Sequence, residues 1–73
     1  MNLKVKQKEN KMTGLEKVRK DMGLTKNEMA SELCVLPEEY SRYEQNTYSI
    51  PLPILKLASF ITAKPTSYLL SEV

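Results

Sequence analysis

The chain has 73 residues, enough for one small domain and too few for a second hydrophobic core. Its single cysteine, Cys34, excludes an internal disulfide, and the absence of histidine excludes both a zinc site of nitrogen and sulfur ligands and a histidine-based catalytic pair. Two glycines are too few for a dinucleotide-binding or phosphate-binding loop. We therefore expect a protein without a cofactor or enzymatic activity, located in a reducing compartment, the cytoplasm.

The positive charge is concentrated near the N-terminus. Residues 1–11 carry four lysines against one glutamate, whereas residues 12–73 carry seven basic residues against eight acidic ones. We expect residues 1–12 to form a basic, flexible tail and residues 13–73 to form the folded domain. Such a tail is either simply solvated or acts as an arm on nucleic acid.

Capping patterns predict where the first two helices begin. In a capping box, a threonine hydroxyl accepts a hydrogen bond from a backbone amide three residues later, and a glutamate at that position accepts one in return. The two pairs with this spacing are Thr13 with Glu16 and Thr25 with Glu28. Gly23 is suited to end the first helix, because it tolerates a left-handed backbone. The predicted helices cover residues 14–22 and 26–33.

Prolines and apolar spacing predict three further helices. Pro37 stands where proline is best tolerated, at the first position of a helix that we expect Asn46 to end. The fourth helix begins at Pro53, after a loop over residues 46–53, and Lys64-Pro65 interrupts it. A last short helix covers residues 65–71. The expected inward stripe of the fourth helix is Ile54, Leu57, Ala58 and Ile61.

The second and third predicted helices have the spacing of a helix-turn-helix. The small Ala30 allows the two helices to cross closely, and Val35 fills the turn between them. Tyr40 and Tyr43 are expected in the core. The sequence thus predicts an all-α fold, a compact five-helix domain that contains a helix-turn-helix.

Over residues 13–70 the chain resembles the helix-turn-helix domains of the Cro and lambda-repressor type, which are regulators of phages, plasmids and bacteria. The matching residues are Leu15, Val18, Arg19, Gly23, Leu24, Thr25, Met29, Ala30, Val35, Glu44, the segment Ile50-Pro51-Leu52 and the pair Leu57-Ala58. The resemblance implies a sequence-specific, double-stranded DNA-binding transcriptional repressor whose third helix enters the major groove. It also implies a structural ion pair between Arg19 and Glu44.

Three positions depart from the family pattern. Cys34 stands in the turn where glycine is usual, and a left-handed backbone at a residue with a Cβ costs roughly 1 kcal/mol. Leu36 stands where serine or threonine usually caps the third helix, and Lys26 replaces a common glutamine. We expect Cys34 to pack as a small hydrophobic residue.

The resemblance places candidate DNA contacts on the second helix, the third helix and the following loop. Arg42 could read guanine or bind phosphate, or it could form a salt bridge with Glu38. Lys26 and the first-turn amides of its helix could bind a phosphate. The loop residues could contact the DNA backbone or be ordinary polar residues. The candidates are Lys26, Asn27, Pro37, Glu38, Glu39, Ser41, Arg42, Gln45, Asn46, Thr47 and Tyr48.

Acidic residues on the third helix favour a second hypothesis. Glu38, Glu39 and Glu44 oppose Arg42 there, and Glu38 and Glu39 are expected to face outward, where they would repel phosphates. A protein-binding helix-turn-helix, such as a modulator or antirepressor of another regulator, is therefore the alternative function.

The last two helices contain more apolar residues than one buried stripe requires. The residues in excess are Leu55, Phe60, Leu69, Leu70 and Val73. Because contiguous exposed apolar groups usually mark an interface, we expect a homodimer formed through these helices.

Overall fold

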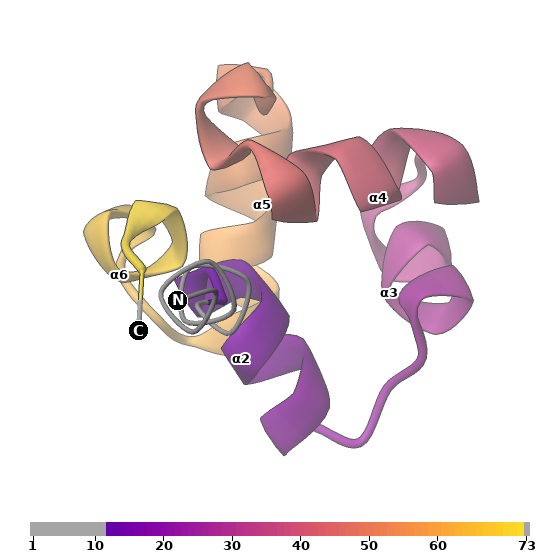
Figure 1. The fold of residues 1–73 in the computed structure, drawn as a ribbon, viewed down its shortest axis with the longest axis horizontal. Helices are drawn as coiled ribbons and strands as arrows, with labels where there is room; N and C mark the ends of the chain where they lie inside the picture. Colours follow the sequence, from indigo (N-terminus) through magenta and orange to yellow (C-terminus); the bar gives the residue numbers. More distant parts are fainter. Residues whose placement is uncertain (1–11, 73) are drawn as a thin grey trace, which may run out of the picture.

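The structure, a computed structural model, describes residues 12–72; Val73 and residues 1–11, where most of the predicted tail falls, lie outside this range. The described chain contains five α-helices and one short 3-10 turn (Figure 1). In chain order these are α2 (Gly14–Asp21), α3 (Lys26–Leu33), α4 (Pro37–Gln45), η1 (Thr47–Ser49), α5 (Leu52–Thr62) and α6 (Thr66–Leu70). The predicted all-α class and the number of helices are confirmed.

The helix starts follow the threonines, with one difference. At α3 the capping box is complete: the Glu28 amide donates to Thr25 Oγ1 at 3.1 Å, and the Thr25 amide donates to Glu28 Oε1 at 2.8 Å. At α2 the Glu16 amide donates to Thr13 Oγ1 at 3.2 Å, but the Glu16 carboxylate lies 3.1 Å from Lys20 Nζ, one turn further along the helix. The ion pair with Lys20 thus takes the place of the second half of the box.

Three residues with left-handed backbones follow helices. Gly23 has a φ of 75°, as expected after α2, while Cys34 after α3 and Ala63 after α5 have φ values of 60° and 61°. The strain expected at Cys34 is therefore present. The expectation that its side chain packs in the core is wrong, because Cys34 is exposed. The left-handed turn directs the thiol away from the core that α3 and α4 share.

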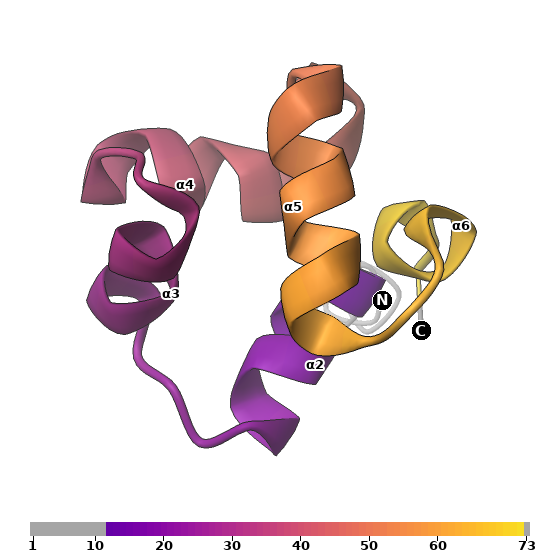
Figure 2. The same ribbon diagram turned by 180° about the vertical axis from the view of Figure 1, so that it is seen from behind.

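The helices pack around a single core. α3 packs against α4, α2 packs against α6, and α5 contacts both α3 and α6. Figure 2, the view from behind, shows α5 passing between the α3–α4 side and α6. The buried apolar residues are Leu15, Val18, Met29, Ala30, Leu33, Tyr40, Tyr43, Ile50, Leu55, Ala58 and Leu69. Both tyrosines expected in the core are there.

The rotation of α5 about its own axis differs from the prediction. The helix begins at Leu52 and not at Pro53, and its buried residues are Leu55, Ala58 and Thr62. Of the expected stripe only Ala58 is buried; Ile54, Leu57 and Ile61 are half-buried flanks. The reason is that α5 is apolar on nearly every side, so periodicity alone does not select the buried side.

This rotation changes which apolar residues are in excess. Leu55 and Leu69 belong to the core, and Leu70 is half-buried, so these do not offer a free surface. Phe60 is 83% exposed, as expected, and Leu52 is 60% exposed. The homodimer stays a prediction, now with fewer residues to support it.

A glycine holds the two ends of the described chain together. The Gly14 amide donates to the Ser71 carbonyl at 2.8 Å, beside an isolated antiparallel bridge between Thr13 and Glu72. A Cβ at Gly14 would lie 1.9 Å from the Tyr68 carbonyl oxygen, a rigid backbone atom. The start of α2 can thus approach α6 this closely only because residue 14 is glycine.

We expect Gly14→Ala to destabilise the domain by about 3 kcal/mol, because two backbones must separate to admit a methyl group. Gly23→Ala is the matched control: nothing lies within 4 Å of a Cβ there, so only the left-handed backbone opposes it, at about 1 kcal/mol. Thermal melting of both variants checks this. Equal losses would show that the close approach of α2 to α6 does not limit stability.

We expect Cys34→Gly and Ala63→Gly each to raise stability by up to about 1 kcal/mol, because glycine adopts the left-handed backbone without strain. The greater freedom of glycine in the unfolded chain offsets part of this gain. A gain of that size raises the melting temperature by roughly 4–8 °C in a domain this small. The control is Ser31→Gly, at an exposed position within α3, which should lower stability by about 0.5 kcal/mol. A loss at all three positions would contradict the expectation.

Candidate nucleic-acid interface on helices α3 and α4

The turn between α3 and α4 is set by local hydrogen bonds. It consists of Cys34, Val35 and Leu36, and the Val35 amide donates to the Ala30 carbonyl at 3.0 Å. Val35 is half-buried against the core, as expected of a residue that fills the turn. The predicted helix-turn-helix arrangement is thus formed.

The start of α4 uses a glutamate from its own first turn. Leu36 has no side-chain acceptor, but its amide donates to Glu39 Oε1 at 3.2 Å. Glu39 is half-buried, whereas Glu38 is exposed. The expectation that Glu38 faces outward is confirmed, and the Glu39 carboxylate caps the start of its own helix at an exposed hydrogen bond.

A buried ion pair joins α2 to α4, which confirms the predicted pair. Arg19 Nε donates to Glu44 Oε2 at 2.6 Å, with side chains 8% and 3% exposed. The Tyr40 hydroxyl donates to the same oxygen at 2.5 Å, and Arg19 Nη1 donates to the Leu24 carbonyl at 2.7 Å. Arg19 thus ties together α2, the segment that leads into α3, and the C-terminal turn of α4.

The electrostatics of this cluster favour a charged arginine and a neutral tyrosine. Burial disfavours the guanidinium of Arg19, but the hydrogen bond and the charge of Glu44 outweigh burial and raise the pKa of Arg19. Burial and then the hydrogen bond to Glu44 raise the pKa of Tyr40 well above its ordinary value of 10.0. Folding therefore favours the neutral form of Tyr40. The stability gained in this way is fully present below pH 10 and is lost as the pH rises above that value.

Most of the predicted DNA contacts lie on the surface. Arg42 is exposed and makes no ion pair with Glu38 or with any other residue in 12–72, so the salt-bridge alternative is not realised here. Ser41 beside it is half-buried. The exposed candidates are Lys26 and Asn27 at the start of α3, Pro37, Glu38, Arg42 and Gln45 on α4, and Asn46 and Tyr48 after it.

Thr47 is the exception among the loop candidates. It is 4% exposed, and its Oγ1 donates to the Leu70 carbonyl at 3.2 Å, which connects η1 to α6. Its neighbour Tyr48 is 82% exposed, and the Tyr48 amide donates to Asn46 Oδ1 at 3.2 Å. The loop therefore divides into a residue that supports the fold and residues that are available to a partner.

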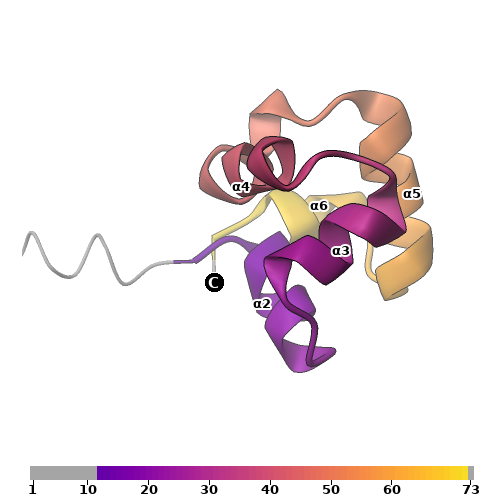
Figure 3. The ribbon, with the colours of Figure 1, turned by 90° about the vertical axis from the view of Figure 1, so that its right-hand side faces the viewer.

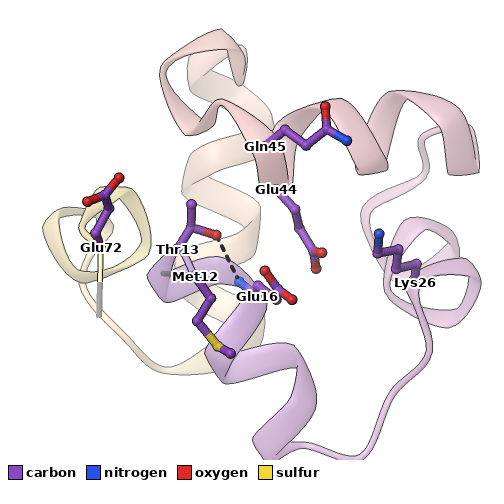
Figure 4. A pocket seen from close by; sticks show the side chains of 7 residues that line it. All are labelled: Met12, Thr13, Glu16, Lys26, Glu44, Gln45 and Glu72. Atoms are coloured by element: carbon purple, nitrogen blue, oxygen red, sulfur yellow. Dashed lines mark hydrogen bonds between the residues drawn. The ribbon is translucent and has the colours of Figure 1, made fainter. Parts of the chain in front are cut away.

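Two open hollows border the C-terminal end of α4. The first, about 320 Å³, is shown in Figure 4: Glu16, Glu44 and Lys26 line it together with Met12, Thr13, Gln45 and Glu72. Its lining has three carboxylates and one lysine. The second, about 360 Å³, is lined by Thr13, Gln45, Asn46, Thr47, Tyr48, Leu70, Ser71 and Glu72, and has only one charged residue.

Two negative findings bound the chemistry of residues 12–72. None of the helices there has the length and apolar character that crossing a membrane requires. No three acidic or cysteine side chains in that part of the chain are grouped closely enough to hold a metal ion.

The prediction from sequence missed the role of Tyr40 in this cluster. The hydroxyl of Tyr40 donates a second hydrogen bond to Glu44 Oε2, although Tyr40 was expected only to pack in the core. A signal exists in the spacing, since Tyr40 precedes Glu44 by four residues and so lies on the same side of α4. The contribution of the Leu24 carbonyl has no such signal, because it depends on the path of the chain between α2 and α3.

A comparison of the sequence with protein-family models finds no matching family, and searches of curated proteins and of solved structures find no match either. The functional conclusion therefore rests on the residues of this chain and their geometry.

We expect Glu44→Gln to destabilise the domain by about 3–5 kcal/mol, because it leaves the buried guanidinium of Arg19 without a counter-charge. Glu32→Gln is the control, since Glu32 is exposed on α3 and makes no ion pair within residues 12–72. Urea denaturation of both variants measures the difference. Similar losses for the two variants would mean that the buried pair contributes little.

Proposed function

We propose that the chain is a sequence-specific double-stranded DNA-binding regulator of transcription, a small repressor that inserts α4 into the major groove. The observation that supports this most directly is a pair of short helices, joined by a three-residue turn, with the outer side of α4 exposed. An α-helix with its side chains is about 10–12 Å wide, which matches a major groove of about 12 Å.

The exposed residues supply both kinds of contact that such a role requires. Arg42 is free to donate two parallel hydrogen bonds to a guanine edge, and no carboxylate within residues 12–72 neutralises it. Lys26 and Asn27, at the start of α3, are suited to hold a phosphate near the amides of a helix N-terminus. Gln45 at the end of α4, with Asn46 and Tyr48 after it, would contact the DNA backbone on the other side of the helix.

The charge balance keeps a second function in consideration. Of the residues of 24–45 that are exposed or half-buried, two are basic and four are acidic, and Glu38 is exposed near the start of α4. A surface with this balance weakens binding to phosphates and favours a partner with basic residues. The alternative is therefore a protein-binding module, such as a modulator or antirepressor of another regulator, that uses the same side of α4.

The rest of the proposal follows from a role on DNA. We place the protein in the cytoplasm and assign it no catalytic activity and no cofactor. Two copies on adjacent major grooves would hold their α4 helices about 34–36 Å apart, the spacing of half-sites one DNA turn apart.

We expect Arg42→Ala to weaken binding to duplex DNA that flanks the protein's own gene by roughly 5- to 150-fold, which corresponds to the loss of one bidentate base contact. Glu38→Gln should strengthen binding to random duplex, because it removes a repulsive charge from the contact surface. Lys56→Ala, which removes a cation from α5, is the control and should alter both affinities much less. Titrations at two salt concentrations give the comparison.

The two functions give different results in that experiment. DNA binding by α4 requires that wild-type affinity fall with rising salt and that Arg42→Ala lower the preference for the flanking duplex over random duplex. If the wild-type protein does not bind duplex at low salt and Glu38→Gln gains no affinity, the DNA proposal fails. A basic protein partner of α4 is then the function to test, and Glu38→Gln should slow its association.

A further inference from the structure

The outer side of α5 is apolar and uncovered within the described residues. Leu52 and Phe60 are 60% and 83% exposed, and Lys56 between them is the only charged residue of the helix. The opposite side is buried in the core through Leu55 and Ala58. Two large apolar side chains left exposed on one side of a helix are typical of an interface, so this side of α5 indicates one.

Three residues define the exposed surface, which we call the α5 stripe: Leu52, Lys56 and Phe60. Their four-residue spacing aligns them along one side of the helix, and the outer two are separated by about 12 Å along its axis. In Figure 3, α5 lies at the opposite side of the molecule from the start of α2, and no residue of α5 lines either hollow. The stripe is therefore separate from the hollows at the end of α4.

The part of the chain that contains the stripe carries charge of one sign. Residues 45–71 contain Lys56 and Lys64 and no acidic residue, whereas residues 12–44 contain five basic residues against seven acidic ones. The Lys64 ammonium lies 5.5 Å from the centre of the Tyr68 ring, so it already has a partner within the fold. Lys56 remains as a cation between two exposed apolar side chains.

This pattern determines which partner fits. When two helices pack through stripes of three residues, the central residues meet. A second copy that used the same stripe would bring its Lys56 against Lys56, with no carboxylate in residues 45–71 to neutralise either one. A helix that carries a carboxylate between two apolar residues would satisfy the cation and cover both Leu52 and Phe60.

We propose that the α5 stripe is a docking surface for an amphipathic helical segment of another protein, one with an acidic residue flanked by apolar residues at four-residue spacing. Phe60 and Leu52 supply the apolar contact, and Lys56 selects the sign of the partner's charge. The inference goes beyond the proposed function, because it concerns a surface outside α3 and α4 and stands whether α4 binds DNA or protein.

The test is a charge-exchange experiment with two designed helical peptides. One carries Leu, Glu and Leu at four-residue spacing on one side, and the other is identical except for Lys in place of Glu. The full chain should bind the Glu peptide at least about fivefold more tightly. Lys56→Glu should reverse the preference, and Phe60→Ser should weaken binding of the Glu peptide by about tenfold or more without lowering the melting temperature.

Three results would overturn the proposal: equal affinity for the two peptides, no binding of either at high micromolar concentration, or a preference that Lys56→Glu leaves unchanged. Sedimentation of the free protein adds a fourth, because a wild-type dimer that Phe60→Ser dissociates would assign the stripe to a second copy. The DNA titration uses Arg42 and Glu38 and so fails or succeeds independently of the peptide experiment.

Discussion

The position of α4 depends on one buried carboxylate. Glu44 receives hydrogen bonds from Arg19 on α2 and from Tyr40 one turn earlier on α4, all on the single oxygen Oε2. Its other oxygen, Oε1, is buried and accepts no hydrogen bond from the described residues. A buried ion pair gains stability only when its geometry is good and its remaining polar atoms are satisfied, so the pair contributes more to orientation than to net stability.

That orientation matters for recognition because Glu44 and Arg42 lie on opposite sides of the same helix. Holding Glu44 inward toward Arg19 requires that Arg42, two residues earlier, face outward, and Arg42 is exposed. Gln45, the last residue of α4, and Asn46 after it are also at the surface. The buried carboxylate of Glu44, whose replacement would lower stability, thus determines which residues of α4 a partner can reach.

Local signals were sufficient to predict the helices, and the family resemblance implied the ion pair, but neither predicted the other contacts that depend on distant parts of the chain. Thr25 with Glu28 and the left-handed Gly23 each act within a few residues. The need for glycine at position 14 arises from the Tyr68 carbonyl, and the burial of Thr47 arises from the Leu70 carbonyl. In α5 the local signal itself was ambiguous, because the apolar residues occur on every side of the helix and only packing against α3 and α6 selects Leu55.

The two surfaces that the fold leaves open differ in charge, and this difference has a consequence for how they could work together. The surface of α3 and α4 is rich in acidic residues with isolated cations at Lys26 and Arg42, whereas residues 45–71 have no acidic residue. If α4 binds DNA as proposed, the carboxylates at its surface repel phosphates, so affinity would depend on a few well-placed contacts and on additional binding energy from elsewhere. A partner held on the α5 stripe supplies that energy if it also contacts DNA, because linking two weak sites raises their combined affinity without any new contact at α4. An acidic α4 and a cationic, apolar α5 are therefore compatible with one function, in which the partner raises the occupancy on DNA of a weakly binding regulator.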